Sequence, residues 1–286
     1  MRCSTKPQSI CWNFLLTLAI VSTLSTPLRA SLIGVGIFVN TVFDQTSAAA
    51  PTSPTDYFFS IGGTFQNTTD FNSASASDPA IGSPQSLDLS GTGFGTSFPG
   101  ITSLATFNAD YPTGMYTITA ANSVTHTSQS GVINYTQNLY TNTIPALSGS
   151  TYTGLQGMNP SMPFTFNFNS FTMNPSANTA YTFLTVYNGS NIVFTDGFLS
   201  PTTTSVLLPA NTLLPNTAYS FELNFDDRLL GTDSVNNVAT EQGFDLRTDG
   251  SFTTGAAVPE PASLALAALG LIGMGVWRKK WRALTV

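Results

Sequence analysis

Hydrophobic and polar residues alternate with a period of two along most of residues 31–255. The clearest case is PFTFNFNSFTM, in which Phe164, Phe166 and Phe168 fall on one face and the residues between them on the other. Successive side chains of a strand point to opposite sides, so this alternation is typical of half-buried strands. The same pattern predicts strands at residues 115–121, 131–140, 181–187 and 218–225. Turn formers such as NGSN and YPTG separate the runs, and we therefore expect an all-β body.

The spacing of the predicted strands favours two antiparallel β-sandwich domains, residues 31–143 and 144–255, joined through the segment NTIPALSG. The first domain is the less regular one, because its Gly-, Ser- and Thr-rich residues 71–100 read as long loops. A single large jelly roll over the whole body is the alternative.

The first thirty residues are typical of an export signal. Arg2 and Lys6 precede an apolar run, FLLTLAIVSTL, and the small residue Ala30 offers a cleavage site, so we expect a signal-peptide helix over residues 1–30. The alternative is an uncleaved membrane anchor, although the apolar run is shorter than the ~20 residues that a span needs. Both cysteines, Cys3 and Cys11, lie in this segment, so a cleaved chain has no disulfide and relies on core burial for its stability.

The last thirty residues show a different order of features. The stretch ASLALAALGLIGMGVW, residues 262–277, carries no charge, and a cluster of cations follows it directly at Arg278, Lys279, Lys280 and Arg282. As a helix these 16 residues would extend about 24 Å, and flanking cations stay on the cytoplasmic side of a membrane. We therefore expect a C-terminal transmembrane helix with the body outside. A short buried helix is the alternative.

The body between these ends is strongly acidic. Residues 31–257 hold fourteen carboxylates and two cations, Arg228 and Arg247, which leaves a net charge of −12. Such a body repels phosphate backbones, so nucleic acid is excluded as a partner.

Candidate catalytic residues are scarce. His126 is the single histidine, lies in the polar run SVTHTSQSG and has no partner at the spacing of a triad or a zinc site, so we expect it in a solvated strand or loop. Glu222 and Glu241 are candidates for the two acids of a glycosidase, but Glu222 alternates with apolar neighbours and is expected to face solvent. We predict no catalytic residues and no cofactor.

A group of acids late in the body is the remaining candidate for a metal site. Oxygen ligands for Ca²⁺ are available from Asp226, Asp227, Asp233, Asp245 and Asp249. They match no calcium-loop spacing, and two arginines nearby are available to pair with them. A solvated acidic loop is therefore the favoured interpretation, and calcium binding stays open.

The tail resembles a known family of sorting signals. Pro259-Glu260-Pro261, then an Ala-, Gly- and Leu-rich span, then terminal cations resemble the PEP-CTERM sorting domain of exported bacterial proteins, over residues 258–282. The resemblance implies a precursor held transiently in the inner membrane, processed near Pro-Glu-Pro by an exosortase, and then released or attached at the surface.

The second half of the body resembles fibronectin type III and related immunoglobulin-like domains. Leu213, Pro215, Thr217 and Tyr219 match the approach to the sixth strand of such domains, and the resemblance covers residues 147–255. It implies a tyrosine corner, in which the hydroxyl of Tyr219 returns to an upstream backbone group, and a core aromatic at Phe168. The segment 226–242 departs from the pattern, because it reads as an unusually long final loop.

Together these features favour a non-enzymatic exported protein of the cell surface, extracellular matrix or biofilm. A carbohydrate-binding module for exopolysaccharide, with or without Ca²⁺, is the main alternative. A secreted hydrolase is a third, supported only by scattered carboxylates.

Overall fold

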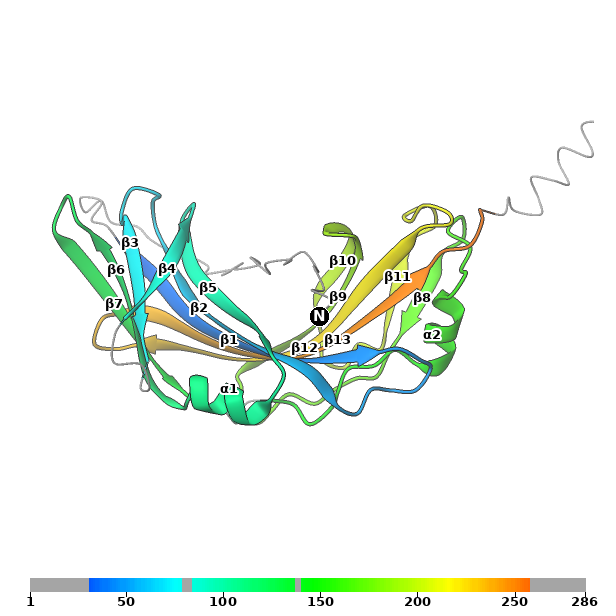
Figure 1. The fold of residues 1–286 in the computed structure, drawn as a ribbon, viewed down its shortest axis with the longest axis horizontal. Coiled ribbons are helices and arrows are strands. Elements are labelled where there is room, and N and C mark those ends of the chain that lie inside the picture. Colours follow the sequence, from blue (N-terminus) through cyan, green and yellow to red (C-terminus); the bar gives the residue numbers. More distant parts are fainter. Residues whose placement is uncertain (1–30, 79–83, 137–139, 258–286) are drawn as a thin grey trace, which may run out of the picture.

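The computed structural model describes residues 31–78, 84–136 and 140–257. The signal peptide and the C-terminal tail expected from the sequence lie outside these residues. The described chain is all-β, with two short helices, α1 (Leu104–Asp110) and α2 (Gly149–Leu155), each begun by a serine whose side chain accepts from a backbone N–H group (Figure 1).

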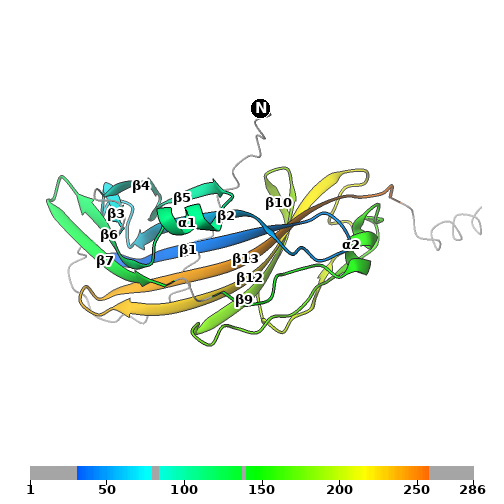
Figure 2. The ribbon, with the colours of Figure 1, turned by 60° about the horizontal axis from the view of Figure 1, so that its bottom comes forward.

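Thirteen strands make up the described part of the body. In chain order they are β1 (Leu32–Gln45), β2 (Pro54–Phe65), β3 (Ser73–Ser77), β4 (Gln85–Ser90), β5 (Gly93–Ile101), β6 (Gly114–Asn122), β7 (Thr127–Tyr135), β8 (Phe164–Asn167), β9 (Thr179–Asn188), β10 (Asn191–Leu199), β11 (Ser205–Leu208), β12 (Ala218–Asp233) and β13 (Val238–Thr253). Eleven form one sheet in the order β10-β9-β12-β13-β1-β2-β5-β4-β3-β6-β7, and β11 pairs with β8. The large sheet curves into a trough with one concave face (Figures 1 and 2).

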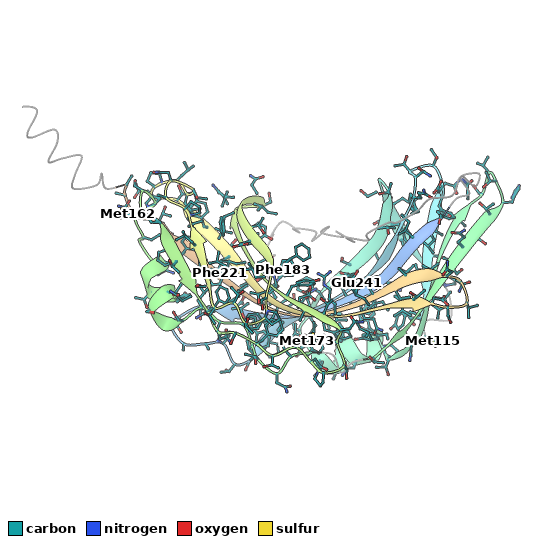
Figure 3. All side chains as sticks on the ribbon, turned by 180° about the vertical axis from the view of Figure 1, so that it is seen from behind. Met115, Met162, Met173, Phe183, Phe221 and Glu241 are labelled. Carbon is teal, nitrogen blue, oxygen red and sulfur yellow. The ribbon has the colours of Figure 1, made fainter. Side chains whose placement is uncertain are left out.

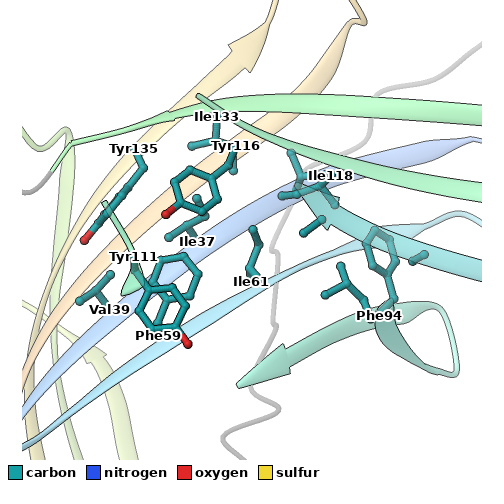
Figure 4. Packing of buried hydrophobic residues seen from close by; sticks show 14 of the residues in the cluster. Ile37, Val39, Phe59, Ile61, Phe94, Tyr111, Tyr116, Ile118, Ile133 and Tyr135 are labelled. Atoms are coloured by element: carbon teal, nitrogen blue, oxygen red, sulfur yellow. The ribbon is translucent and has the colours of Figure 1, made fainter. Parts of the chain in front are cut away.

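The first lobe of the trough contains strands β1 to β7. Within it, β1-β2-β5-β4 follow one another, and so do β3-β6-β7, which is the A-B-E-D and C-F-G order of an immunoglobulin-type sandwich. The pairing of β3 with β4 joins the two groups along one side. Their inner faces enclose core 1, where the rings of Phe59 and Tyr111 stack 4.2 Å apart (Figure 4).

The second lobe places β8 and β11 against the β10-β9-β12-β13 part of the sheet. The rings of Phe166 and Phe168, whose alternation is evident in the sequence, are buried in core 2 together with Phe221 and Phe225. The helix α2 adds the buried side chain of Leu155.

Two long strands connect the lobes. The hairpin of β12 and β13 begins and ends in core 2, but its far half gives Val238 and Phe244 to core 1. Strand β1 lies parallel to β13 over twelve residue pairs, from Gly34–Ala239 to Gln45–Gly250, and antiparallel to β2. The segment between the lobes is fixed as well, because the amide of Gln45 both donates to and accepts from the backbone of Leu147.

Two loop predictions are wrong. The expected long loop at residues 226–242 is strand, since β12 continues to Asp233 and β13 starts at Val238, leaving a four-residue turn. The extra length is stabilised by β1, which pairs with β13 from Ala239 to Gly250. Residues 71–100 also contain strands, β3, β4 and most of β5, because small buried residues such as Ala74 and Ala76 pack closely in core 1.

The tyrosine corner expected in the second lobe is present. The hydroxyl of Tyr219 accepts a hydrogen bond from the backbone N–H of Leu214 at 2.8 Å, and its ring stacks on Phe252. The first lobe has a second corner that the sequence analysis missed, in which the Tyr116 hydroxyl donates to the carbonyl of Pro112 at 3.0 Å. Both corners show proline four residues before tyrosine.

We expect Tyr219→Phe to lower the free energy of unfolding by about 1 kcal/mol, because the substitution leaves a partly buried N–H group without its acceptor. Urea denaturation measures the change. Tyr181→Phe is the matched control, since the structure gives the Tyr181 hydroxyl no hydrogen bond within the described chain. Equal midpoints for both variants would contradict a stabilising corner.

Candidate functional site

The concave face of the trough gathers most of the charged groups of the second half of the body. With a period of two, one face of β12 carries Glu222, Asp226 and Arg228, and the facing positions of β13 carry Glu241, Asp245, Arg247 and Asp249. Both arginines of residues 31–257 are among them. Figure 3 shows Glu241 and Phe183 on this side of the sheet. The opposite face of the same strands lines the two cores.

Arg228 is the centre of the first cluster. Its guanidinium pairs with the carboxylate of Asp226 on the same strand and with Glu241 on β13, the latter at 2.7 Å. Asp226 is 1% exposed and Glu241 6% exposed. The guanidinium also lies over the rings of Phe38, Tyr181 and Phe183 at 5.6 to 6.0 Å, from strands on both sides.

Arg247 forms a second, looser cluster further along β13. It pairs with Asp249 at 2.9 Å and approaches Glu222 at 3.7 Å, and its guanidinium lies 5.4 Å from the ring centre of Phe58 on β2. Glu222 also accepts a hydrogen bond from the Tyr187 hydroxyl at 2.9 Å. The expectation that Glu222 faces solvent is wrong, because these partners cover it to 9% exposure.

Between the arginines, Asp226 and Asp245 stand directly opposite each other on β12 and β13. One oxygen of each carboxyl group, Oδ1, is buried. Burial first, and then the neighbouring charge of Asp226, raise the pKa of Asp245 well above its ordinary value. A proton bound to this pair reduces its negative charge, so less charge is buried away from water in the folded protein.

Aromatic rings form the rim of the same face. The ring of Phe198 on β10 packs edge-on against Tyr181 and Phe183 at 5.1 and 5.0 Å and is 50% exposed. Its backbone has a φ of +56°, a strained value for a bulky residue, in the irregular part of the β9–β10 pairing. Gly197 leaves room for the neighbouring ring, since a Cβ there would lie 2.6 Å from Phe183.

Asp227 projects to the other side, into the seam between the two cores, and is fully buried. Its carboxylate accepts from the backbone N–H of Asn174 at 3.2 Å, and the side chain of Asn174 donates to the carbonyl of Tyr140. Desolvation, with a smaller contribution from the charge of Asp226, raises the pKa of Asp227 to about 6.

This pKa predicts an unusual pH dependence. The folded protein binds a proton at Asp227 below about pH 6, whereas the unfolded chain binds it only near the ordinary aspartate pKa of 3.8. Above pH 6 the charged Asp227 therefore lowers the free energy of unfolding by about 3 kcal/mol, and below pH 4 this cost is absent. We expect the Asp227→Asn variant to be more stable than the parent at pH 7 and to lose this advantage at pH 4. The gain should be smaller than about 3 kcal/mol, because the amide N–H groups of the introduced asparagine are buried too.

Urea denaturation at pH 4, 5.5 and 7 measures the difference. Asp233→Asn is a control of opposite sign, since hydrogen bonds from Asn236 and the turn backbone lower the pKa of Asp233 and stabilise its charge. An Asp227→Asn advantage that is the same at every pH would refute the assignment.

Several residues that the sequence analysis considered lie outside the concave cluster. His126 is exposed in the β6–β7 turn with a φ of +54°, as a solvated loop residue. Asp233 accepts two backbone hydrogen bonds in the β12–β13 turn. Within the described residues no group of three or more His, Cys, Asp or Glu side chains could hold a metal ion. The sorting-motif residues Pro259, Glu260 and Pro261 and the basic cluster lie outside the described part.

The sequence analysis noted that two arginines were available to pair with these acids but missed the aromatic partners. One sequence feature could have indicated that these residues form a strand. The alternation continues past residue 225, with Phe225, Asp227 and Leu229 on one side and Asp226 and Arg228 on the other.

A protein-family model matches the C-terminal tail. The PEP-CTERM protein-sorting motif matches residues 257–280. The chain carries a PEP-CTERM motif. This motif marks it as an exported, membrane-anchored precursor that is sorted to the surface and implies processing by an exosortase. Among the described residues no helix is long and apolar enough to cross a membrane.

Among curated proteins, none matches the chain. Solved structures that match include the FN1–FN3 domains of chicken CNTN1 at 10% identity, with a TM-score of 0.26 over 82% of this chain and 67% of the other. A DUF3823 family protein from Parabacteroides merdae has 14% identity and a TM-score of 0.23 over 68% and 91%. The BSP domain of a biofilm-associated protein has 13% identity and a TM-score of 0.21 over 81% and 30%. With TM-scores this low, the superpositions support no conclusion about this chain. The topology described above rests on the strand pairing of this chain alone.

Proposed function

We propose that the protein is a non-catalytic surface protein that acts through its β-sandwich body in the cell envelope, the extracellular matrix or a biofilm. The matched sorting motif is the observation that carries this proposal. In it, the signal peptide is removed after Ala30, residues 262–277 span the membrane as a helix, and the cations Arg278, Lys279, Lys280 and Arg282 hold the tail on the cytoplasmic side. The exosortase then recognises Pro259-Glu260-Pro261.

For the body we propose two immunoglobulin- or fibronectin-type sandwiches, residues 31–143 and 144–255, that share the β12–β13 hairpin. Repetition supports this arrangement. Each lobe has a tyrosine corner before its penultimate strand, at Tyr116 and Tyr219. Each following hairpin ends in a turn in which Asn122 or Asp233 accepts from the backbone N–H groups two and three residues later.

The absence of catalysis is supported by what the carboxylates do. Asp226 and Glu241 are occupied by Arg228, and Glu222 by Tyr187 and Arg247. These partners favour a structural role for the three acids.

Mass spectrometry of the protein released from cells tests the sorting proposal. We expect an N-terminus at Ser31 and a C-terminus near Pro259, with the apolar tail missing. A released chain that still contains residues 262–286 would refute it.

A second candidate function is binding of a neutral exopolysaccharide on the concave face. The rings of Tyr181, Phe183 and Phe198 are partly exposed and pack against one another, and such rings can stack on the apolar face of a sugar. Acidic glycans are disfavoured, because both arginines of this face are already paired with carboxylates.

Sedimentation with matrix polysaccharide tests this candidate, with and without EDTA to expose any calcium requirement. Phe198→Ala should lose binding, whereas Val124→Ala, an exposed apolar residue on the β6–β7 turn, should keep it. Equal binding by both variants would contradict a site on the concave face.

A further inference from the structure

The folded body holds the chain firmly until a few residues before the sorting motif. The backbone N–H of Gly255 donates to the carbonyl of Met158 at 2.7 Å, and its carbonyl accepts from Asn216 at 3.0 Å. The hydroxyl of Thr254 donates to the carbonyl of Leu214 at 2.6 Å. A Cβ at position 255 would lie 2.5 Å from the carbonyl oxygen of Gly157, so the strand end sits tightly between two loops.

The length of chain beyond Gly255 limits how far the body can stand from the membrane. Six residues lie between Gly255 and Ala262, where the apolar run of the tail begins, so seven Cα–Cα steps join the two positions. Fully extended, they reach at most about 25 Å. The polar headgroup region occupies part of that distance, because the whole bilayer is about 10 to 15 Å thicker than its hydrocarbon core. The end of lobe 2 therefore lies close to the membrane surface in the anchored precursor.

This end, which we call the exit face, consists of residues 157–163, 205–217 and 251–257. Hydrogen bonds from Asn211 to Pro160 and from Gly255 to Met158 hold the three segments together. Figure 3 shows Met162 at the same end of the molecule as the C-terminal end of β13. The three segments are thus in contact with one another where the chain leaves the body.

The exit face is uncharged and partly apolar. It contains no ionisable side chain, although residues 31–257 carry a net charge of −12. It exposes large apolar residues instead, Met162 at 44%, Leu207 at 60% and Leu214 at 62%. Exposed apolar side chains on an uncharged surface suit the boundary between headgroups and acyl chains, where a carboxylate would be repelled by anionic lipid.

We propose that the exit face docks on the bilayer surface while the tail is still anchored, with Leu207 and Leu214 entering the headgroup region. The inference rests on the membrane-anchored precursor. It predicts that the body stands on the membrane in one orientation, with the β12–β13 turn at the opposite end from the lipid.

Cysteine labelling of the full chain in an exporting host without an exosortase tests the docking. In a chain with Cys3 and Cys11 replaced by Ser, a single cysteine is introduced by Leu214→Cys or, as the matched control, by Val235→Cys on the distal turn, where the side chain is 89% exposed. Spheroplasts are treated with a membrane-impermeant maleimide before and after detergent.

We expect Leu214→Cys to label slowly in spheroplasts and rapidly in detergent, and Val235→Cys to label rapidly in both. An eight-residue Gly/Ser insertion between Ala256 and Pro259 should abolish the protection of Leu214→Cys, because it frees the body from the surface. Rapid labelling of Leu214→Cys in spheroplasts, with the chain in the membrane fraction, would overturn the docking alone. A chain absent from the membrane fraction would overturn the anchoring and the docking together.

Discussion

Arg228→Met is expected to lower the free energy of unfolding by about 3 to 5 kcal/mol at pH 7, because it leaves two buried carboxylates without their cation. Asp226 and Glu241 are almost fully buried and both pair with this guanidinium. Methionine fills similar volume and keeps the contact with the surrounding rings, so the loss reports mainly on charge. Urea denaturation measures it.

The size of the effect should depend on pH. Burial raises the pKa of Glu241, and Arg228 opposes that rise, so without Arg228 the pKa of Glu241 is higher still; the destabilisation is therefore largest at neutral pH and becomes smaller as the pH falls. Arg247→Met is the matched control, and we expect it to lower the free energy of unfolding by about 1 kcal/mol. The ion-pair partner of Arg247, Asp249, is more exposed than the partners of Arg228, and Arg247 lies 3.7 Å from Glu222. Equal losses for the two variants would show that burial does not set the cost.

Replacement of Pro259, Glu260 and Pro261 by alanine is expected to abolish release and leave the precursor in the membrane fraction. The three residues lie within the matched motif, between the last fixed residue of the body and the apolar tail. Cell fractionation and immunoblotting measure the distribution. The fold should be unaffected, because the substitution lies beyond the described strands, and an unchanged melting temperature of the detergent-extracted protein is the control. Release at the parental level would mean that Pro-Glu-Pro is not what the processing enzyme recognises.

The local features of this protein could be predicted from its sequence, and the long-range ones could not. Alternation at Phe164, Phe166 and Phe168 indicates a strand whatever that strand pairs with. The tyrosine corner at Tyr219 is equally local, since its acceptor and donor lie five residues apart. The sorting motif can be recognised because the order of its three parts along the chain is sufficient to identify it.

The pairing of β1 with β13 joins residues about 200 positions apart, and no local pattern announces it. That pairing extends the final hairpin, which is why a charged stretch taken for a loop is strand. The role of Arg228 depends on rings from β1 and β9 that meet only after the sheet has formed. The second corner at Tyr116 was within reach, because the Pro-x-x-x-Tyr spacing of residues 112–116 repeats that of residues 215–219.

The parallel pairing of the first and last strands has a mechanical consequence. A force that pulls on the chain end after β13 acts along the strand axis, so it loads the ladders to β1 and β12 in shear. The hydrogen bonds of twelve residue pairs with β1 and of sixteen residue pairs with β12 must then break together. A force perpendicular to the strands would break them one pair at a time. If the protein is held at the cell surface by its C-terminal end, drag from flowing medium or from neighbouring cells pulls along the axis of β13. This is the direction in which the fold resists unfolding most strongly.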